Sequence, residues 1–243
     1  MMIARSLYLQ GLGFMQGWHY EDSDTNESRE IDILSTSYAY GKNILLIQAI
    51  IECKYSEQPL LAFTYKGLSK SPVDFWVPCN VLGRNTLNKI IQERLINEIP
   101  VFSQQNTIAY TLKQVYQDEE VKKKDRRDAA FEAIMSVVNA SYSLSKLYTE
   151  KLTTLPSIDG TELKPSVFIG MPTVVVRAPL FICYLDDKNR IALEPQSSLL
   201  LEWSYPKVGL MMIRVIQEEK IVNFGKDIAH SIEMFNDELK DDF

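Results

Sequence analysis

Residues 29–59 read REIDILSTSYAYGKNILLIQAIIECKYSEQP, and the fold prediction starts from this stretch. Its second half holds an apolar run, residues 44–51, that only Gln48 interrupts. Apolar residues that fill both faces of a short segment are typical of a central, fully buried β-strand. The alternating pattern of residues 29–37 predicts a second strand, and the turn between the two segments predicts a hairpin.

Charged residues stand at the end of the predicted buried strand. Glu52 and Lys54 flank Cys53, and because side chains alternate along a strand, the two charged groups point to one face and the thiol to the other. Asp32 lies on the preceding strand, about as far from the turn as Glu52. If the strands pair, the two carboxylates are near neighbours across the ladder. Charge is costly to bury without a partner, so this arrangement predicts a function for it.

Two adjacent carboxylates repel each other and favour a cation between them. Magnesium, or manganese in its place, fits this pair, because Mg²⁺ takes oxygen ligands and keeps positions for water and phosphate. Asp32 and Glu52 are the predicted metal ligands, with the backbone carbonyl of Cys53 as a further oxygen. Lys54 would then hold an attacking water or offset charge on a phosphoryl transition state. A surface ion pair at a strand end is the structural alternative.

The segments REID and IECK resemble the Asp…Glu-x-Lys signature of the restriction-endonuclease-like, PD-(D/E)xK, nuclease superfamily, with the type IV restriction and resolvase-like branches nearest. The resemblance covers roughly the first 66 residues and implies a mixed central sheet flanked by helices. It also implies magnesium-dependent hydrolysis of phosphodiester bonds, usually in DNA, with defence against foreign DNA as one role. Asp32 and Glu52 match the metal-binding acids of the family, and Lys54 matches its catalytic lysine.

The sequence departs from the family pattern at two places. Residue 31, before Asp32, is Ile where many members have Pro, and the helix predicted within residues 2–16 has no acid where many members supply one. Glu21, Asp22 or Glu27 are the acids that would take its place, although no motif selects among them.

The order of predicted elements suggests one α/β domain over residues 1–243. Its core, residues 1–66 and 166–243, is rich in predicted strands and ends in an amphipathic helix, and a helical insertion occupies about 80–155. That insertion has helices predicted near residues 86–99, 106–120 and 125–148. In the core, residues 166–185 predict two short strands separated around Pro172 and Pro179. Two separate domains are the alternative.

Composition limits the classes of partner. A formal net charge of −6 gives no overall attraction to nucleic acid, so a DNA site must be local or assisted by a metal. A basic run is the candidate for phosphate contact, although acids surround it and a solvated charged face is the alternative. The run consists of Lys122, Lys123, Lys124, Arg126 and Arg127.

The three cysteines form no CxxC pair, which favours a reduced, cytoplasmic setting over a disulfide framework or a zinc site. No apolar stretch approaches the roughly 20 residues that cross a bilayer, so no membrane partner is expected. Two further hypotheses stand beside the nuclease. The chain is either an inactive nuclease-fold binding or scaffold subunit, or an interaction module whose function lies in its helical middle. A homodimer or a partner subunit is compatible with each.

Overall fold

The computed structural model describes residues 2–22, 25–64, 77–92, 98–103, 107–116 and 128–238 of the chain. The strands in this part are β1 (Gly13–Glu21), β2 (Ser28–Tyr40), β3 (Ile44–Tyr55), β4 (Leu60–Thr64), β5 (Ile108–Gln114), β6 (Thr154–Pro156), β7 (Leu163–Arg177), β8 (Leu180–Leu185), β9 (Ile191–Pro195), β10 (Ser198–Tyr205) and β11 (Gly209–Gln217). The helices are α1 (Met2–Tyr8), α2 (Val81–Gln92), α3 (Pro100–Ser103), α5 (Ala129–Glu150) and α6 (Ile221–Glu238), with the 3₁₀-helix η3 (Glu218–Lys220) directly before α6.

The strands form one large mixed sheet in the order β1-β2-β3-β7-β11-β10-β5-β4-β8-β9, and β6 pairs with β7 beside this path. The first three strands are antiparallel to one another, whereas β3 runs parallel to β7. Parallel neighbours need a crossover connection, and α5 lies within the long connection from β3 to β7. The protein is therefore mixed α/β, as the sequence predicts.

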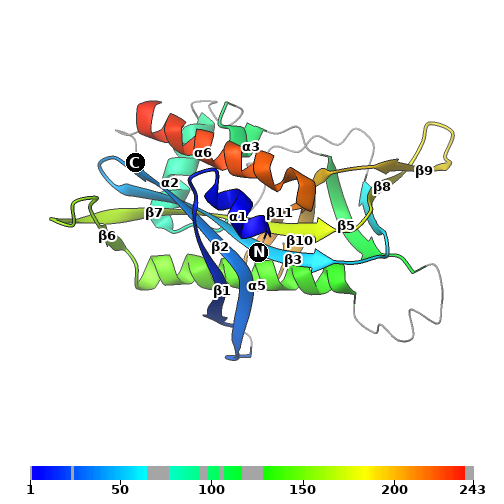
Figure 1. Ribbon diagram of the computed structural model, residues 1–243, viewed down its shortest axis with the longest axis horizontal. Helices are drawn as coiled ribbons and strands as arrows, with labels where there is room; N and C mark the ends of the chain where they lie inside the picture. The colour runs from blue at the N-terminus through cyan, green and yellow to red at the C-terminus, as the bar shows by residue number, and fades with distance from the viewer. Residues whose placement is uncertain are drawn as a thin grey trace.

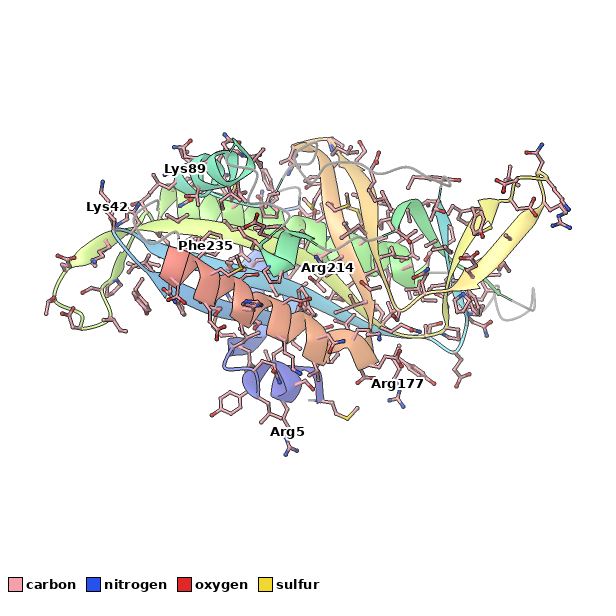
Figure 2. The ribbon with its side chains drawn as sticks, turned by 90° about the horizontal axis from the view of Figure 1, so that it is seen from above. Arg5, Lys42, Lys89, Arg177, Arg214 and Phe235 are labelled. Carbon is pink, nitrogen blue, oxygen red and sulfur yellow. The ribbon has the colours of Figure 1, made fainter. Side chains whose placement is uncertain are left out.

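Helices cover both faces of the sheet (Figure 1). One apolar core lies between the sheet and α5, and it contains Ile134 and Val137 of the helix together with Ile50 and Phe168 of the strands. The other core lies between the opposite face and helices α1, α2, α3 and α6. Figure 2 shows α6 along that second face, with Phe235, which is fully buried, near the end of the helix. Among the described helices, none combines the length and the apolar character needed to cross a membrane.

The β2–β3 hairpin forms as predicted, and β3 is a central strand of the sheet. The hairpin register runs from Tyr40 opposite Ile44 to Ile33 opposite Ile51. β3 is paired on its other side with β7, and all of its residues from Ile44 to Glu52 are buried. The apolar run is therefore a central strand because both its faces are covered by helices and both its edges by strands.

Residues 108–114 form a strand, β5, so the prediction of a helix over residues 106–120 is wrong. β5 pairs with β4 and β10, which come from distant parts of the sequence. The segment contains Ile108, Tyr110 and Thr111, which favour strands when neighbouring strands are available. Tertiary pairing thus overrides the short helical pattern. The segment of about 80–155 contains α2, α3 and α5 but also this strand of the main sheet, so the prediction of a wholly helical insertion is wrong as well.

β7 is a single long strand that continues through Pro172, where the sequence predicts a break. Pairing with β6 ends at Pro165 and pairing with β11 begins only at Thr173. Between these residues, among the described strands, none pairs along the edge of β7 that faces away from β3, and a single bridge joins Ile169 to Cys79. The N–H of Gly170 points away from β3, toward the carbonyl of Pro78, and Pro172 has the same orientation two residues later. The missing N–H of Pro172 therefore breaks no bond to β3.

The long helix α5 confirms the prediction of a helix in residues 125–148. Asp128 is its N-cap, and the Oδ1 atom of Asp128 accepts hydrogen bonds from the backbone N–H groups of Ala130 and Phe131. The side of α5 that faces the sheet is buried, and it includes Ala130, Ile134, Val137, Leu144 and Tyr148. Ser141 is fully buried as well, and its hydroxyl makes no hydrogen bond in the described part of the chain.

Candidate functional site

The structure brings Asp32, Glu52 and Lys54 together where β2 and β3 separate. The pairing of the two strands ends at Ile33 and Ile51. If this register continued by one residue, Asp32 would lie directly opposite Glu52. The site is therefore formed at the end of the hairpin ladder, on the parts of β2 and β3 that the sequence selects.

The side chain of Asp32 accepts a hydrogen bond from β3 that a backbone carbonyl of β2 would accept in a regular ladder. Its Oδ2 atom accepts a hydrogen bond of 2.7 Å from the backbone N–H of Cys53, a group that would face Ile31 if the register continued. Within a strand, the N–H and C=O of one residue lie on the same edge. The carbonyl of Cys53 therefore faces the same side as the Asp32 carboxylate, as a ligand of a shared cation must.

Glu52 and Lys54 lie on the face that α5 covers, and Cys53 packs into the opposite core, which confirms the predicted alternation. The Nζ atom of Lys54 is 3.0 Å from Oε1 of Glu52. Glu52 is only 6% exposed, while the side chain of Lys54 keeps 30% of its surface accessible. The pair is thus buried on the acid side and open to solvent on the amine side.

The electrostatics of the site follow from this partial burial. Burial raises the pKa of Glu52, and the nearby charge of Asp32 adds to the rise, while the hydrogen bond from Lys54 opposes it. For Lys54, burial alone would lower the pKa, but the hydrogen bond to Glu52 and the charges of Glu52, Asp32 and Glu132 outweigh it and raise the pKa. The site therefore has a surplus of negative charge, and it holds Lys54 protonated.

The thiol of Cys53 lies on the other face of β3 from Glu52 and Lys54. Burial, followed by the charges of Asp32 and Glu52, raises the pKa of its thiol to about 12. A thiol in such a field stays protonated near neutral pH and is a poor nucleophile. The Cys53 side chain is half-buried and packs against the core on the α6 side of the sheet. All three cysteines of the chain are free thiols.

Glu132 is a member of this environment that the sequence does not predict. It lies in the first turn of α5, half-buried, and its charge contributes to the raised pKa of Lys54. Almost 80 residues separate it from Lys54, and only the packing of α5 against β3 brings them within electrostatic range. No motif in the sequence joins the two segments, so local patterns carry no signal for it.

The donor set can be compared with the needs of a divalent cation. Asp32 and Glu52 supply two carboxylates and Cys53 a carbonyl, all hard oxygen ligands of the kind that Mg²⁺ and Mn²⁺ bind. Within the described ranges, no group of three or more His, Cys, Asp or Glu side chains is arranged to hold a metal ion. A cation held by Asp32 and Glu52 would have two protein carboxylates and would take its remaining oxygens from water and substrate.

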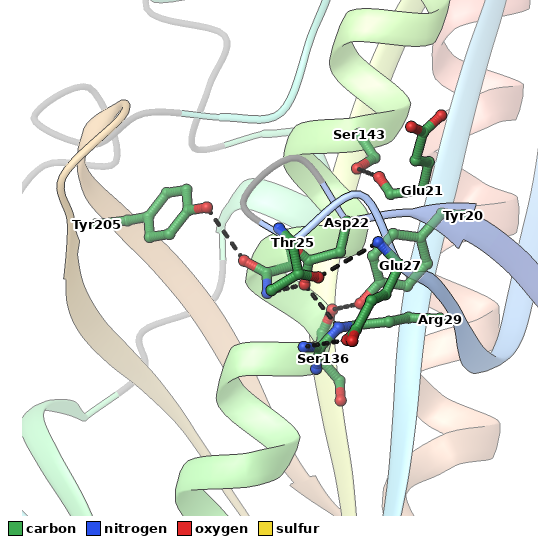
Figure 3. A network of polar contacts seen from close by, with 10 residues as sticks. Tyr20, Glu21, Asp22, Thr25, Glu27, Arg29, Ser136, Ser143 and Tyr205 are labelled. Atoms are coloured by element: carbon green, nitrogen blue, oxygen red, sulfur yellow. Dashed lines mark hydrogen bonds and ion pairs between the residues drawn. The ribbon is translucent and has the colours of Figure 1, made fainter.

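Asp22, one of the acids considered as a substitute for the missing helix acid, belongs to a separate network (Figure 3). It is 1% exposed, and its Oδ2 atom is 2.7 Å from Nε of Arg29. The same oxygen accepts a hydrogen bond from Nδ2 of Asn139, whose Oδ1 atom accepts one from the hydroxyl of Tyr205, both at 3.1 Å. Asp22 is therefore committed to tying β1, α5 and β10 together.

The other candidate residues do not add to the site. Glu27 is exposed and lies 3.6 Å from Arg29, beside the Asp22 network, and the backbone carbonyl of Glu21 accepts a hydrogen bond from Ser143 on α5. The basic run of Lys122, Lys123, Lys124, Arg126 and Arg127 falls outside the described residues. The run ends one residue before Asp128, the N-cap of α5.

Comparisons of the chain with protein-family models, with curated proteins and with solved structures find no match.

Proposed function

We propose that the chain is a divalent-cation-dependent nuclease that hydrolyses phosphodiester bonds, with DNA as its substrate. The observation that carries the proposal is the convergence of Asp32, Glu52 and Lys54. One acid from β2 and an acid and an amine from β3 lie together at the point where the two strands part. The likeness of REID and IECK to the PD-(D/E)xK signature supplies the reaction class, and the restriction-endonuclease-like fold is part of the same proposal.

In this proposal Asp32 and Glu52 hold Mg²⁺ or Mn²⁺, together with the carbonyl of Cys53. The cation supplies Lewis-acid stabilisation of the phosphoryl group. The hydrogen bond from the Cys53 N–H fixes the Asp32 carboxylate in place before substrate binds, so less reorganisation is needed. The surplus negative charge beside Glu52 makes the site receptive to a cation and repels a bare phosphate. Substrate binding should therefore depend on the metal.

In this proposal Lys54 is the residue that acts on the substrate. Its side chain is partly exposed, and its amine is kept protonated by Glu52 and Asp32. A protonated amine at this position offsets charge that develops on the phosphoryl oxygens, and it orients a water by donating a hydrogen bond. Substrate would further be held by the basic run that precedes Asp128. A cytoplasmic location and a role in defence against foreign DNA belong to this proposal.

The test is cleavage of supercoiled plasmid and of branched DNA by the full chain, with Mg²⁺ or Mn²⁺ and with EDTA. We expect cleavage only with the cation, and a loss of at least about 100-fold in Lys54→Ala, the usual cost of removing a transition-state stabilising group. Lys146→Ala is the matched control, because Lys146 is an exposed lysine on α5 whose ion pair to Glu150 is 3.9 Å long. Equal cleavage by wild type and Lys54→Ala would refute the proposal.

A second candidate is a catalytically inactive nuclease fold that binds nucleic acid or scaffolds a partner. The observation that favours it is the sequence of α1, MIARSLY, which has no acid. This candidate predicts a DNA mobility shift that is the same in EDTA and in Mn²⁺, with the DNA left intact. The nuclease predicts a shift that strengthens with a non-cleaving cation such as Ca²⁺, because the cation would carry part of the phosphate contact.

A further inference from the structure

The β1–β2 ribbon changes face at one pair of residues, Gly17 and Asp32. In the β1–β2 register, Gln16 lies opposite Ile33 and Trp18 opposite Ile31, so Gly17 lies opposite Asp32. Ile31 belongs to the core on the α5 side, whereas Ile33 belongs to the core on the α6 side. Residues two apart on a regular strand share a face, so the ribbon must turn over at this pair.

The neighbouring residues of β1 show the same change of face. Trp18 and Tyr20 pack into the core on the α5 side, and the hydroxyl of Tyr20 donates a hydrogen bond of 3.3 Å to the carbonyl of Ser136 on α5. The earlier residues of β1, Gly13 to Gln16, are exposed, and α1 packs against this part of the ribbon. The end of β1 thus wraps around α5 while its beginning stays beside α1 (Figure 1).

Gly17 provides the backbone conformation for this turn. Its φ angle is +61°, in the left-handed region, although it lies within a strand. Other residues adopt this region at a cost, and Asn tolerates it best. Asp32 is not among the described residues with positive φ. The unusual conformation at the turn is therefore carried by the glycine, and the aspartate contributes the functional side chain.

We propose that Gly17 is a positioning residue for the candidate site: its left-handed conformation turns the ribbon so that the Asp32 carboxylate points toward β3 and accepts the Cys53 N–H. The hydrogen bond from Cys53 to Asp32 depends on this turn, because the carboxylate of a residue on a regular strand would stand above or below the sheet. The proposal deepens the nuclease proposal and rests on it for the role of Asp32. The geometric part is measurable without any activity.

The test compares Gly17→Ala with Gly17→Asn in the full chain. An ideal Cβ at position 17 would lie 3.0 Å from Oε1 of Glu30, the mobile end of a half-exposed side chain, so the space is adjustable and the φ angle is the main obstacle. Gly160→Ala is the matched control. Gly160 has a φ of +69° and nothing within 4 Å of its ideal Cβ, in the turn between β6 and β7.

The readout is hydrogen–deuterium exchange of the Cys53 amide by NMR, with Asp32→Asn as the reference for a weakened acceptor. We expect Gly17→Ala to accelerate exchange of this amide at least about tenfold, and Gly17→Asn to remain within a few-fold of wild type, because Asn adopts positive φ more readily. Gly160→Ala should leave the amide as in wild type. In the cleavage assay, Gly17→Ala should lower kcat and Gly17→Asn restore most of it.

An unchanged Cys53 amide in Gly17→Ala, or equal acceleration in Gly160→Ala, would overturn the inference. If Gly17→Ala fails to fold, the Gly17→Asn chain provides the test. A folded Gly17→Asn chain whose Cys53 amide exchanges as fast as in Asp32→Asn would also overturn the positioning role of Gly17. The experiments distinguish failure of the nuclease proposal from failure of the positioning role of Gly17. Altered amide exchange in a chain without any cleavage would keep the positioning role and remove the nuclease.

Discussion

Two acidic clusters lie beside α5, and they differ in how their charge is balanced. Asp22 meets the guanidinium of Arg29, the amide of Asn139 and the backbone N–H of Thr25. Glu52 is buried almost as deeply, but its cationic partner, Lys54, is shared with a second acid, Asp32, whose charge raises the pKa of Glu52.

The difference is the one expected between an acid that holds structure together and an acid that binds a cation. A buried carboxylate with a cation and several donors is satisfied and holds elements together. Two acids that share one lysine leave negative charge uncompensated, which costs stability unless a cation completes the site. We infer that substitutions in the Asp22 network reduce stability and leave DNA cleavage intact. Substitutions in the Asp32 site should reduce DNA cleavage and leave stability nearly unchanged.

The largest effect is expected at Asp32. The change Asp32→Asn keeps the size of the side chain and removes its charge, so we expect DNA cleavage to fall by about 100- to 1,000-fold while the free energy of unfolding changes by less than about 1 kcal/mol. Rates of plasmid cleavage and urea denaturation measure the two quantities. A folded Asp32→Asn chain with wild-type cleavage would place Asp32 with the structural acids.

Asp22→Ala should show the reverse. It removes the partner of Arg29 and leaves the amide of Asn139 without its acceptor, so we expect the free energy of unfolding to fall by about 2–3 kcal/mol. This value is below that of a fully buried pair, because the side chain of Arg29 is 46% exposed. Cleavage per folded molecule should be unchanged within about threefold. A large loss of cleavage in a stable chain would assign Asp22 to the site.

Tyr148 extends the comparison to a neutral buried group on the same face. Burial raises its pKa to about 12, and the ring stacks on Phe168 at a centroid distance of 4.4 Å. The unfolded chain loses the phenolic proton near pH 10, before the folded chain does, so the stability from this group is complete below pH 10 and is lost as pH rises to about 12. The stability of Tyr148→Phe relative to wild type should therefore increase by about 2–3 kcal/mol across this range.

Equilibrium denaturation of both chains at pH 8, 10 and 11 would measure the trend. A difference between them that stays flat with pH would show that Tyr148 is more exposed to solvent than the structure indicates.

The smallest effect is expected at the outer end of the Asp22 network. Tyr205→Phe removes the hydroxyl that donates to Oδ1 of Asn139, and loss of one such bond costs about 1 kcal/mol. Thermal denaturation should show a small decrease in Tm, and the affinity for Mn²⁺ should not change. A change in metal affinity would show that the two clusters are coupled through Tyr20, whose pKa is raised by burial and by Asp22, with a smaller contribution from Glu52.

The sequence predicts the part of the fold whose pattern is local. The apolar run of β3 and the alternation at Glu52, Cys53 and Lys54 depend on neighbouring residues, so the strand and its faces can be predicted without the tertiary structure. The proximity of Asp32 also follows, because a hairpin turn brings the strands together. The change of face at Gly17 does not follow, since a single glycine within a strand predicts a bulge or a close approach but not which residue it turns.

The other half of the sheet depends on distant partners. β5 becomes a strand because β4 and β10 lie on either side of it, and β7 continues through Pro172 because the edge that lacks an N–H faces away from β3. Glu132 and the Asp22 network likewise depend on where α5 packs. Neither kind of contact has a signature in a single sequence, because most of the residues involved are separated by 45 positions or more along the chain.

The central claim, that Asp32 and Glu52 jointly bind a divalent cation, is tested most directly by calorimetric titration of Mn²⁺ into the metal-free full chain. Wild type and Asp22→Asn should bind one ion with similar affinity, while Asp32→Asn and Glu52→Gln should each lose at least about tenfold in affinity, as expected for removal of a metal-binding charge. Absence of binding in wild type, or binding by Asp32→Asn as tight as that of wild type, would contradict the claim.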